Sequence, residues 1–433
     1  MNKVKLGNLC KICSSKRIHE ADYVSSGIPF VRGLEITNGD LLKPNVDYNC
    51  YITRDLYSQI KNKYGVPKKG DILITAVGTV GNVCYIDVDK EFYFKDGNII
   101  WFKDFDKKIN AKYLYYYMQS PYFKKQLDCA LIGAVQKALT MVMLSEINVP
   151  IPDYDIQCYI ASTLEKIDDK IKNNNGIISE LESMAKTLYD YWFLQFEFPN
   201  EEGKPYKSSG GKMVWNEELK RDIPEGWSYE TLYGKYSIER GISYSSKDIE
   251  NNTGMAMINL ACIDINRNYR TGELKYFDGV VKEKNILNHN DLLVACTDLT
   301  RNADIVGCPI LTPDDGVSYT YSMDIAKIIP NEKWFNKYFL YMTLRTDFYH
   351  NYIKKWASGT NVLHLNLKGI DWYKTWIPPK ELQNKFATIV KDVHSKKSSI
   401  IKENQQLTSL RDFLLPMLMN GQVTFKKEGE SIA

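Results

Sequence analysis

The feature that most constrains the fold of this chain is a long internal repeat. One stretch, INVPIPDYDIQCYIASTLEKID, resembles a later one, YKTWIPPKELQNKFATIVKDVH. The repeat places Pro152 on Pro378 and Gln157 on Gln383, so the residue numbers in both pairs differ by 226. A repeat of this length predicts two structural units of one kind rather than a single continuous core.

Two further pairs of segments extend the repeat towards the start of the chain. KYLYYYMQSPYF from Lys112 aligns with KYFLYMTLRTDF from Lys337 at an offset of 225, which predicts that one residue is gained or lost before Gly133 and Gly359. GDILITAVGTVGN from Gly70 aligns with NDLLVACTDLTRN in the second half. The two halves therefore carry the same parts in the same order.

Each half contains short β-type runs, then a helical stretch, an irregular segment and a proline before a long helix. The runs include Ile72–Val77, Asn98–Phe102, Ala256–Leu260 and Leu292–Ala295, and turn residues separate them. The pattern predicts an α+β fold with two similar, mixed, strand-rich domains and two long helices. The predicted boundaries are 1–152 for the first domain, 153–196 for the first helix, 197–225 for a linker rich in Gly and Pro, 226–379 for the second domain, 380–421 for the second helix and 422–433 for a polar tail.

The two long helices carry seams with the alternating 4,3 spacing of a coiled coil. The first seam is Ile160, Leu164, Ile167, Ile171, Asn174, Ile178, Leu181, Ala185, Leu188 and Trp192. The second is Phe386, Val390, Val393, Lys397, Ile400, Asn404, Leu407, Arg411, Leu414 and Leu418.

The polar seam positions predict how the helices pair. If facing residues have numbers that sum to 578, Asn174 meets Asn404, Ile178 meets Ile400 and Leu164 meets Leu414. A buried Asn pair fixes coiled-coil register at some cost in stability. We therefore predict an intramolecular antiparallel coiled coil. The alternative is that each helix packs separately on its own domain.

Composition excludes several classes of protein. With 56 Lys and Arg against 53 Asp and Glu, the net charge of +3 gives no bulk argument for nucleic-acid binding. No apolar run approaches the roughly 18 residues of a membrane span, and nine scattered cysteines suit a reducing compartment. A soluble cytoplasmic protein is expected. The lone pair Cys10 and Cys13 predicts no zinc or redox site, so no metal is expected.

The segment between the halves, FPNEEGKPYKSSGGKMVWNEELKRDIPEGW, carries four short motifs in a fixed order. They are Phe198-Pro199, Gly203 to Tyr206, Ser209 to Gly211 and Ile223 to Trp227. With SGIPFVRG, GDIL followed by GTVG, and GAVQKALT in the first half, this order resembles the specificity subunits of type I restriction-modification enzymes. The second half departs from the pattern, with NDLL in place of GDIL and no Gly-x-x-Gly after it.

The resemblance implies two target-recognition domains, each reading one half of an asymmetric, bipartite double-stranded DNA site. It implies that the helices set the spacer and dock two methyltransferase subunits, with restriction and translocase subunits in the full complex. It also implies a non-catalytic chain that binds no cofactor, with S-adenosylmethionine in the partner methyltransferase. Two modules at a fixed separation are the geometry that dimeric DNA readers use.

Two other classes of protein compete with this interpretation. An enzyme acting on DNA would need a Gly-rich cofactor loop and an Asn/Asp-Pro-Pro-aromatic motif, or a Walker loop, and the sequence has none of them. A free-standing DNA-binding regulator or scaffold without methyltransferase partners remains open.

Candidate DNA-contacting residues lie in turns and breaks of both halves, where donors and acceptors can reach base edges. They are Arg32, Thr79, Asn82, Gln136 and Lys137 in the first half, and Arg301, Asn302, Thr360, Asn361 and His364 in the second. The alternatives are a structural carboxylate partner for Arg32 and turn formation for Asn82. The tyrosine-rich stretch from Tyr113 to Phe123, followed by Lys124 and Lys125, resembles a surface on which bases could stack, but aromatic residues at matching positions of the second half favour a core role.

Overall fold

The computed structural model describes residues 2–37, 39, 41, 48, 50–131, 138–249, 253–270, 274–300 and 302–423. They form two compact units. Unit 1 comprises Met1–Lys172 and Gln406–Ala433, and unit 2 comprises Asn173–Gln405. Each unit thus holds one strand-rich domain, the first turns of one long helix and the last turns of the other.

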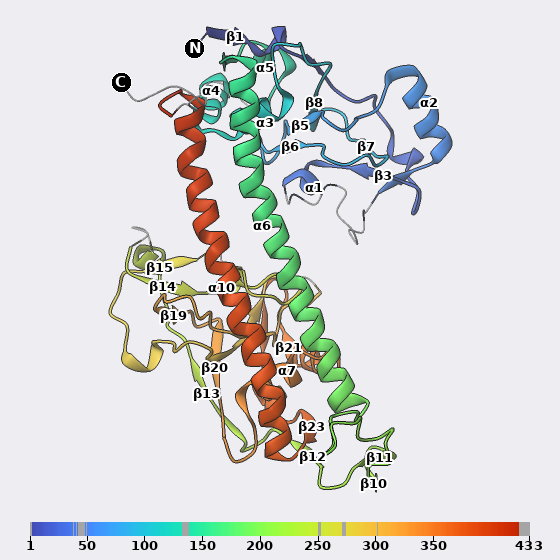
Figure 1. The fold of residues 1–433 in the computed structure, drawn as a ribbon, viewed down its shortest axis with the longest axis vertical. Coiled ribbons are helices and arrows are strands. Elements are labelled where there is room, and N and C mark those ends of the chain that lie inside the picture. The colour runs from blue at the N-terminus through green and yellow to red at the C-terminus, as the bar shows by residue number, and fades with distance from the viewer. Residues whose placement is uncertain are drawn as a thin grey trace. The chain divides into compact units, whose positions relative to one another are not determined.

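Unit 1 is a mixed domain of short strands and helices (Figure 1). Its strands are β1 (Asn2–Lys5), β2 (Lys11–Cys13), β3 (Ile28–Val31), β4 (Tyr51–Ile52), β5 (Ile72–Thr75), β6 (Val83–Tyr85), β7 (Tyr93–Phe94), β8 (Ile99–Lys103) and β9 (Asn148–Ile151). Its helices are α1 (Gly33–Thr37), α2 (Arg54–Tyr64), α3 (Ala111–Gln119), α4 (Pro121–Leu131) and α5 (Met141–Ser145). The long helix α6 (Tyr154–Tyr189) follows.

Unit 2 begins in α6 and continues through a π-helical turn, Asp190–Leu194, at the end of that helix. Its strands are β10 (Met213–Asn216), β11 (Arg221–Pro224), β12 (Ser228–Thr231), β13 (Tyr236–Arg240), β14 (Met255–Ile258), β15 (Lys275–Phe277), β16 (Leu292–Ala295), β17 (Thr297–Asp298), β18 (Pro309–Leu311), β19 (Tyr319–Tyr321), β20 (Ile325–Pro330), β21 (Ala357–Ser358), β22 (Leu363–Leu365) and β23 (Lys374–Ile377). Its helices are α7 (Lys337–Leu344), α8 (Asp347–Ile353), α9 (Lys368–Asp371) and the long helix α10 (Lys380–Met419).

The sheets of the two units have the same topology. The four-stranded sheet β2-β8-β5-β6 corresponds to β13-β20-β16-β18, and the three-stranded sheet β4-β3-β7 corresponds to β15-β14-β19. In both three-stranded sheets the middle strand has one antiparallel and one parallel neighbour. The β1–β9 pairing Asn2↔Ile151 becomes Ser228↔Ile377 in β12–β23, at the offset of 226. The predicted duplication is confirmed.

One buried glutamine in each half fastens the long helix to its domain. In unit 1, Gln157 accepts from the Asn110 amide at 2.8 Å and donates to the carbonyls of Lys108 and Pro152, both at 2.9 Å. In unit 2, Gln383 accepts from the Asn336 amide at 2.8 Å and donates to the carbonyls of Trp334 and Pro378 at 3.0 and 2.9 Å. Gln157 and Gln383 expose 0% and 1% of their surface, so each satisfies three backbone groups that water does not reach.

The predicted offset of 225 over α3 and α7 was wrong. The side chains of Asn110 and Asn336 cap these two helices, and Ser120 and Thr346 accept from the backbone at the start of the next ones. Both pairs differ by 226, so no residue is gained or lost there. The Lys-Tyr pair in both segments suggested the offset of 225, but the start of each helix is set by its capping asparagine.

The helices α6 and α10 lie side by side and antiparallel (Figure 1). In unit 2 the Asn174 amide donates to the Asn404 side-chain oxygen at 2.9 Å, as the register predicts, and Glu182 pairs with Lys397. In unit 1, Asp168 pairs with Arg411 at 3.0 Å. The residue numbers of each pair sum to 578 or 579, which is the pattern of antiparallel helices.

Each helix end is buried in a core. Ile160 and Leu164, at the start of α6, pack with Leu414 and Leu418, at the end of α10. At the other end of α6, the Phe193 ring lies 4.8 Å from Phe339 and 4.9 Å from Phe386, centroid to centroid, and both pairs are edge-to-face. Such aromatic pairs add about 0.5–1.5 kcal/mol each beyond their buried area. The polar seam positions therefore lie between two apolar ends.

Across the described part of the chain, no helix has the length and apolar character that crossing a bilayer requires.

Candidate nucleic-acid interface

The loop between β16 and β18 is organised by one buried carboxylate, Asp298. Its side chain is 0% exposed and accepts from the amides of Thr300, Ile305 and Val306 at 2.6, 2.7 and 2.9 Å. Three backbone hydrogen bonds to one side chain fix the conformation of the loop. As a result the loop holds Leu299, 66% exposed, and the exposed Asn302 at the surface.

A second turn lies directly beside this loop. Strand β17 pairs with β22 through Thr297↔His364 and Asp298↔Leu363, and β22 pairs back with β21. The turn of this hairpin carries Thr360 and Asn361, which are exposed, as is His364. The hairpin that carries Thr360, Asn361 and His364 therefore lies beside β17, the strand from which the loop with Asn302 leaves.

The hairpin turn needs a glycine at its start. Gly359 has a φ of +139°, and a Cβ there would lie 2.0 Å from the Val362 carbonyl oxygen. No other residue type fits without opening the turn. The position of Thr360 and Asn361 at the turn thus depends on Gly359.

In unit 1, three candidates gather around the short helix α1. The Asn82 amide donates to the Thr37 hydroxyl at 3.0 Å, and that hydroxyl lies 2.6 Å from the Thr79 hydroxyl. Thr79 is exposed. The backbone of Asn82 also closes the β5–β6 turn. Its carbonyl accepts from the Thr75 backbone amide, and its own backbone amide donates to the Thr75 hydroxyl. The turn-forming alternative for Asn82 is therefore observed.

Arg32, just before α1, has the structural carboxylate partner that was its alternative. Its guanidinium lies 3.6 Å from Glu35, whose carboxylate also accepts from the Arg32 amide at 2.8 Å. The side chain of Arg32 remains 35% exposed. A role in DNA contact stays a prediction.

Gln136, Lys137 and Arg301 lie outside the described residues. The backbone beyond Lys137 is described, and the Leu139 amide donates to Ala76 at 2.9 Å. In unit 2 the counterpart Leu365 donates to Cys296 at 2.8 Å. In both units, therefore, the same backbone hydrogen bond links this later segment to the first residue of the loop that follows β5 or β16.

The two loops differ in length, which the sequence alignment missed. The segment between β5 and β6 is residues 76–82, whereas that between β16 and β18 is residues 296–308, six residues longer. Gly81 and Gly307 occupy the same point, because their amides bond Thr75 and Ala295, both at 2.9 Å. The counterpart of Asn82 is therefore Cys308, and the alignment of Asn82 with Asn302 was wrong.

Sequence reasoning also missed residues in unit 2. Leu299 and Asp298 lie within the extra loop length, where the first half offers no guide. Lys354 and Lys355 are exposed on the single helical turn Lys354–Trp356 that leads into β21. Two adjacent lysines, separated from SGTN only by Trp356 and Ala357, were a visible signal for phosphate contact.

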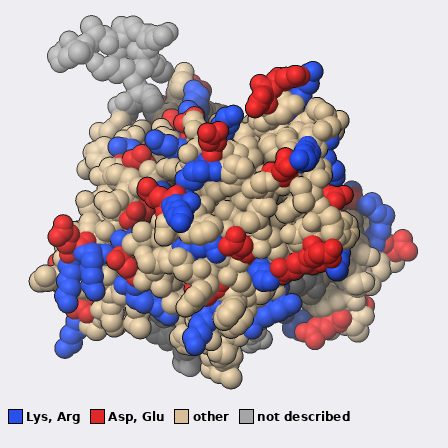
Figure 2. Space-filling view, turned by 90° about the horizontal axis from the view of Figure 1, so that it is seen from below, with Lys and Arg blue, Asp and Glu red and all other residues tan. Residues whose placement is uncertain are grey.

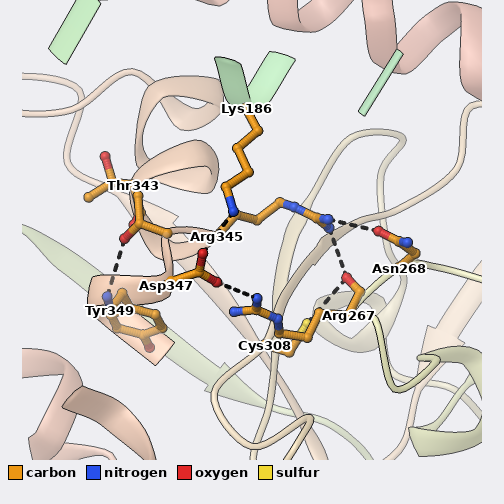
Figure 3. A network of polar contacts seen from close by, with 9 residues as sticks. Lys186, Arg267, Asn268, Cys308, Thr343, Arg345, Asp347 and Tyr349 are labelled. Atoms are coloured by element: carbon orange, nitrogen blue, oxygen red, sulfur yellow. Dashed lines mark hydrogen bonds and ion pairs between the residues drawn. The ribbon is translucent and has the colours of Figure 1, made fainter. Parts of the chain in front are cut away.

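A partly exposed polar network connects the base of the long loop to α6 (Figure 3). Asp347 accepts from Lys186 of α6 and from Arg267, both at 2.7 Å, and these bonds lower the pKa of its carboxyl to about 2. Arg345 donates to the Arg267 carbonyl at 2.8 Å and to Asn268 at 2.7 Å. The Cys308 thiol at the loop base donates to the same Arg267 carbonyl. The loop is thereby held on rigid elements.

Charge does not gather by sign on the face seen in Figure 2, where Lys and Arg are interspersed with Asp and Glu. This agrees with the near-neutral net charge. The exposed donors and acceptors of the candidate interface are mostly uncharged, such as Asn302, Thr360 and Asn361. Uncharged amides and hydroxyls read base edges, while lysines supply the salt-dependent part of the affinity.

The tyrosine-rich stretch is core, as interpreted. Tyr113, Tyr116, Tyr117 and Phe123 expose 2% or less, and Tyr113 and Tyr117 donate to the carbonyls of Pro150 and Asn148, both at 2.9 Å. Tyr122 alone of this group is well exposed, at 43%. Among the described residues, no group of three or more His, Cys, Asp or Glu side chains is placed to hold a metal ion.

Comparison with known proteins agrees with this architecture. Residues 1–183 match the family described as "Type I restriction modification DNA specificity domain". The chain is 26% identical over 366 residues to the MjaIX specificity subunit of Methanocaldococcus jannaschii, covering 82% of this chain and 78% of that one. It is 23% identical over 448 residues to the HindI specificity subunit of Haemophilus influenzae, covering 90% and 94%. Both relatives are subunits of type I restriction enzymes.

The fold is also that of a solved structure, the S subunit of a type I restriction-modification system from M. genitalium. The TM-score is 0.55 at 17% identity, over 96% of this chain and 95% of that one. The two units share one sheet topology, and each contains part of both long helices. Over most of its length the chain is similar to the specificity subunits of type I restriction enzymes.

Proposed function

We propose that this chain is the sequence-specific DNA-binding subunit of a type I restriction-modification complex, and that each unit reads one half of an asymmetric bipartite site. The observation that supports this proposal concerns the equivalent edge of each unit. The two units have the same scaffold there, but it presents different side chains. Unit 1 offers Thr79 on a loop of residues 76–82, and unit 2 offers Asn302 and Asn361 on a longer loop and a hairpin. Equal scaffolds with unequal side chains suit a site with two different halves.

We further propose that α6 and α10 set the spacing between the half-sites and dock two methyltransferase subunits, to which restriction and translocase subunits add. The support is the polar register of the seam, in which Asn174, Asn404 and the Glu182–Lys397 pair allow one alignment. A seam fixed in this way keeps a constant length. The chain itself is proposed to be non-catalytic and to bind no cofactor, with S-adenosylmethionine in the methyltransferase.

The experiment is reconstitution. The chain is mixed with its neighbouring methyltransferase subunit and S-adenosylmethionine, and the methylated sequences are read on a random DNA library. We expect one bipartite motif. A chain that binds DNA but forms no complex with the methyltransferase would favour the free-standing regulator.

Matched variants in the two units sharpen this test. Asn361→Ala should relax base selection in one half of the motif and Thr79→Ala in the other, because each removes one exposed side chain from one unit. Loss of a good base contact costs about 1–3 kcal/mol of discrimination. If either variant relaxes both halves equally, the assignment of one unit to one half-site is wrong.

A further inference from the structure

The two loops that carry the candidate contacts Thr79 and Asn302 each present one apolar side chain to solvent. In unit 1 the segment 76–82 holds Val77, which is 46% exposed, and in unit 2 the segment 296–308 holds Leu299, which is 66% exposed. Neither side chain packs in any of the hydrophobic cores that the described residues form. Because burial of an aliphatic side chain stabilises a fold, both residues lie where they contribute little to folding.

The other apolar side chains of both loops face inward. In unit 1, Ala76 is buried in the core and Val80 packs against it. In unit 2 the remaining apolar side chains of the loop expose 8% or less of their surface, and they are Cys296, Ala303, Ile305, Val306 and Cys308. The exposure of Val77 and Leu299 is therefore selective and is not a general property of these loops.

The duplication does not account for the two exposed side chains. Val77 comes two residues after Thr75, the last residue of β5, whereas Leu299 comes four residues after Ala295, the last residue of β16. They are thus not copies of one ancestral position. A single exposed aliphatic residue is common on protein surfaces. Its occurrence at different positions of the two equivalent loops points instead to a shared use of these loops.

Both side chains are carried on backbone that is held in place. Leu299 directly follows Asp298, whose carboxylate accepts from three backbone amides of the same loop. In unit 1 the Thr75 hydroxyl donates to the Thr79 carbonyl and so closes the turn that holds Val77. A side chain on a fixed loop loses less conformational entropy on binding than one on a loop that must first be ordered.

Uncharged polar side chains lie close to both residues along the chain. Val77 precedes Thr79 by two residues, and Leu299 precedes Asn302 by three. The proposed function places these loops against the edges of base pairs, so an apolar side chain on the same loop would also meet a base edge. In the major groove those edges are polar except for one apolar group, the 5-methyl group of thymine.

We propose that Val77 and Leu299 each contact the 5-methyl group of a thymine in the major groove, so that each half of the DNA site contains one A·T pair recognised in this way. This inference rests on the proposed function and adds to it the chemical group that one residue of each unit recognises. The contact distinguishes thymine from cytosine, which carries no methyl group at that position.

The test uses uracil, which pairs as thymine does but lacks the 5-methyl group. The methylated motif is first determined for the full chain in complex with its methyltransferase subunit. Each thymine of both half-sites is then replaced by uracil, one at a time, and the dissociation constant of the complex is measured. We expect one thymine in each half whose replacement weakens binding about fourfold, because burial of one methyl group is worth about that factor.

Variants of the two loops link each effect to one residue. Val77→Ala should remove the uracil effect in one half-site only, and Leu299→Ala should remove it in the other half-site only, so each variant serves as a control for the other. Val142→Ala, on α5 and 73% exposed, is a further control and should leave both uracil effects in place.

A bipartite motif in which no thymine responds to uracil would overturn this inference and leave the proposed function standing. Uracil effects that persist in Val77→Ala and Leu299→Ala would also overturn it, because another residue would then contact the methyl group. Equal weakening of the thymine and uracil duplexes by these variants would count against it and would indicate insertion of the side chains between base pairs. If the complex methylates no bipartite motif, the proposed function fails and this inference fails with it.

Discussion

The buried glutamine of each unit gives a direct test of the duplication. In Gln383→Leu the side-chain volume is nearly kept, but three backbone groups lose their partners: the amide of Asn336 and the carbonyls of Trp334 and Pro378. A buried polar group left unpaired costs about 1–3 kcal/mol, so the loss of partners for three groups should cost roughly 3–9 kcal/mol in unit 2. That is a large fraction of the roughly 5–15 kcal/mol by which domains are stable.

Hydrogen exchange read by mass spectrometry is the suitable assay, because a chain of two units need not unfold in a single step. Gln383→Leu should speed exchange in α7, β23 and the start of α10, and Gln157→Leu should do the same in α3, β9 and the start of α6. Gln406→Leu, at an exposed position on α10, is the control and should change stability by less than about 0.5 kcal/mol. A loss below about 1 kcal/mol for either buried glutamine would refute the reasoning.

Three further predictions concern unit 2. His394 is buried and its pKa is lowered from 6.5 to about 4, chiefly by burial and then by Lys397, so the unfolded state binds the proton first as the pH falls. The stability of unit 2 should therefore be full above pH 6.5 and fall by up to roughly 3 kcal/mol as the pH drops to 4. Urea unfolding of His394→Gln should lack this pH dependence. A double-mutant cycle with Asn174→Ala and Asn404→Ala, followed by thermal unfolding, should give a coupling of about 0.5–3 kcal/mol, whereas strict additivity would contradict their hydrogen bond. Asp298→Ala should speed hydrogen exchange across residues 299–306 and weaken binding of the half-site read by unit 2, and unchanged exchange would show that the carboxylate does not hold the loop.

The sequence predicted those parts of the fold that depend on periodicity and on repeated residues. The seam spacing gave the antiparallel register, and Asn174 does meet Asn404. The Pro-Gln pairs marked the junction of domain and helix, and Gln157 and Gln383 make identical bonds there. The run Leu292–Ala295 coincides with β16. Such features are local or strictly periodic, which is why one sequence suffices for them.

The errors arose where backbone conformation, not residue identity, is what the two halves share. The departure of NDLL from GDIL is small in the structure, because Asn290 at φ +65° occupies the left-handed position of Gly70 at φ +96°. Asn tolerates this region better than other residues with a side chain. Likewise Gly307 keeps the place of Gly81, six residues further along a longer loop. Letter-by-letter alignment cannot follow an insertion of this kind.

The candidate site was predictable only in part. Turns with exposed Asn and Thr pointed to Thr79, Asn302, Thr360 and Asn361, and the structure groups them at one edge of their units. The role of Asp298 depends on three amides up to eight residues away, so no short motif announces it. The pairing of Arg32 with Glu35 was one of two readings, and the sequence alone offered no means of choosing.

The central claim is that each unit reads its own half of one DNA site. The most direct measurement is methylome sequencing of cells that carry this chain, and of cells in which residues 1–152 are replaced by the first domain of another specificity subunit. The account predicts that one half of the methylated motif changes, while the other half and the gap between them stay the same. A change in both halves, or in neither, would contradict it.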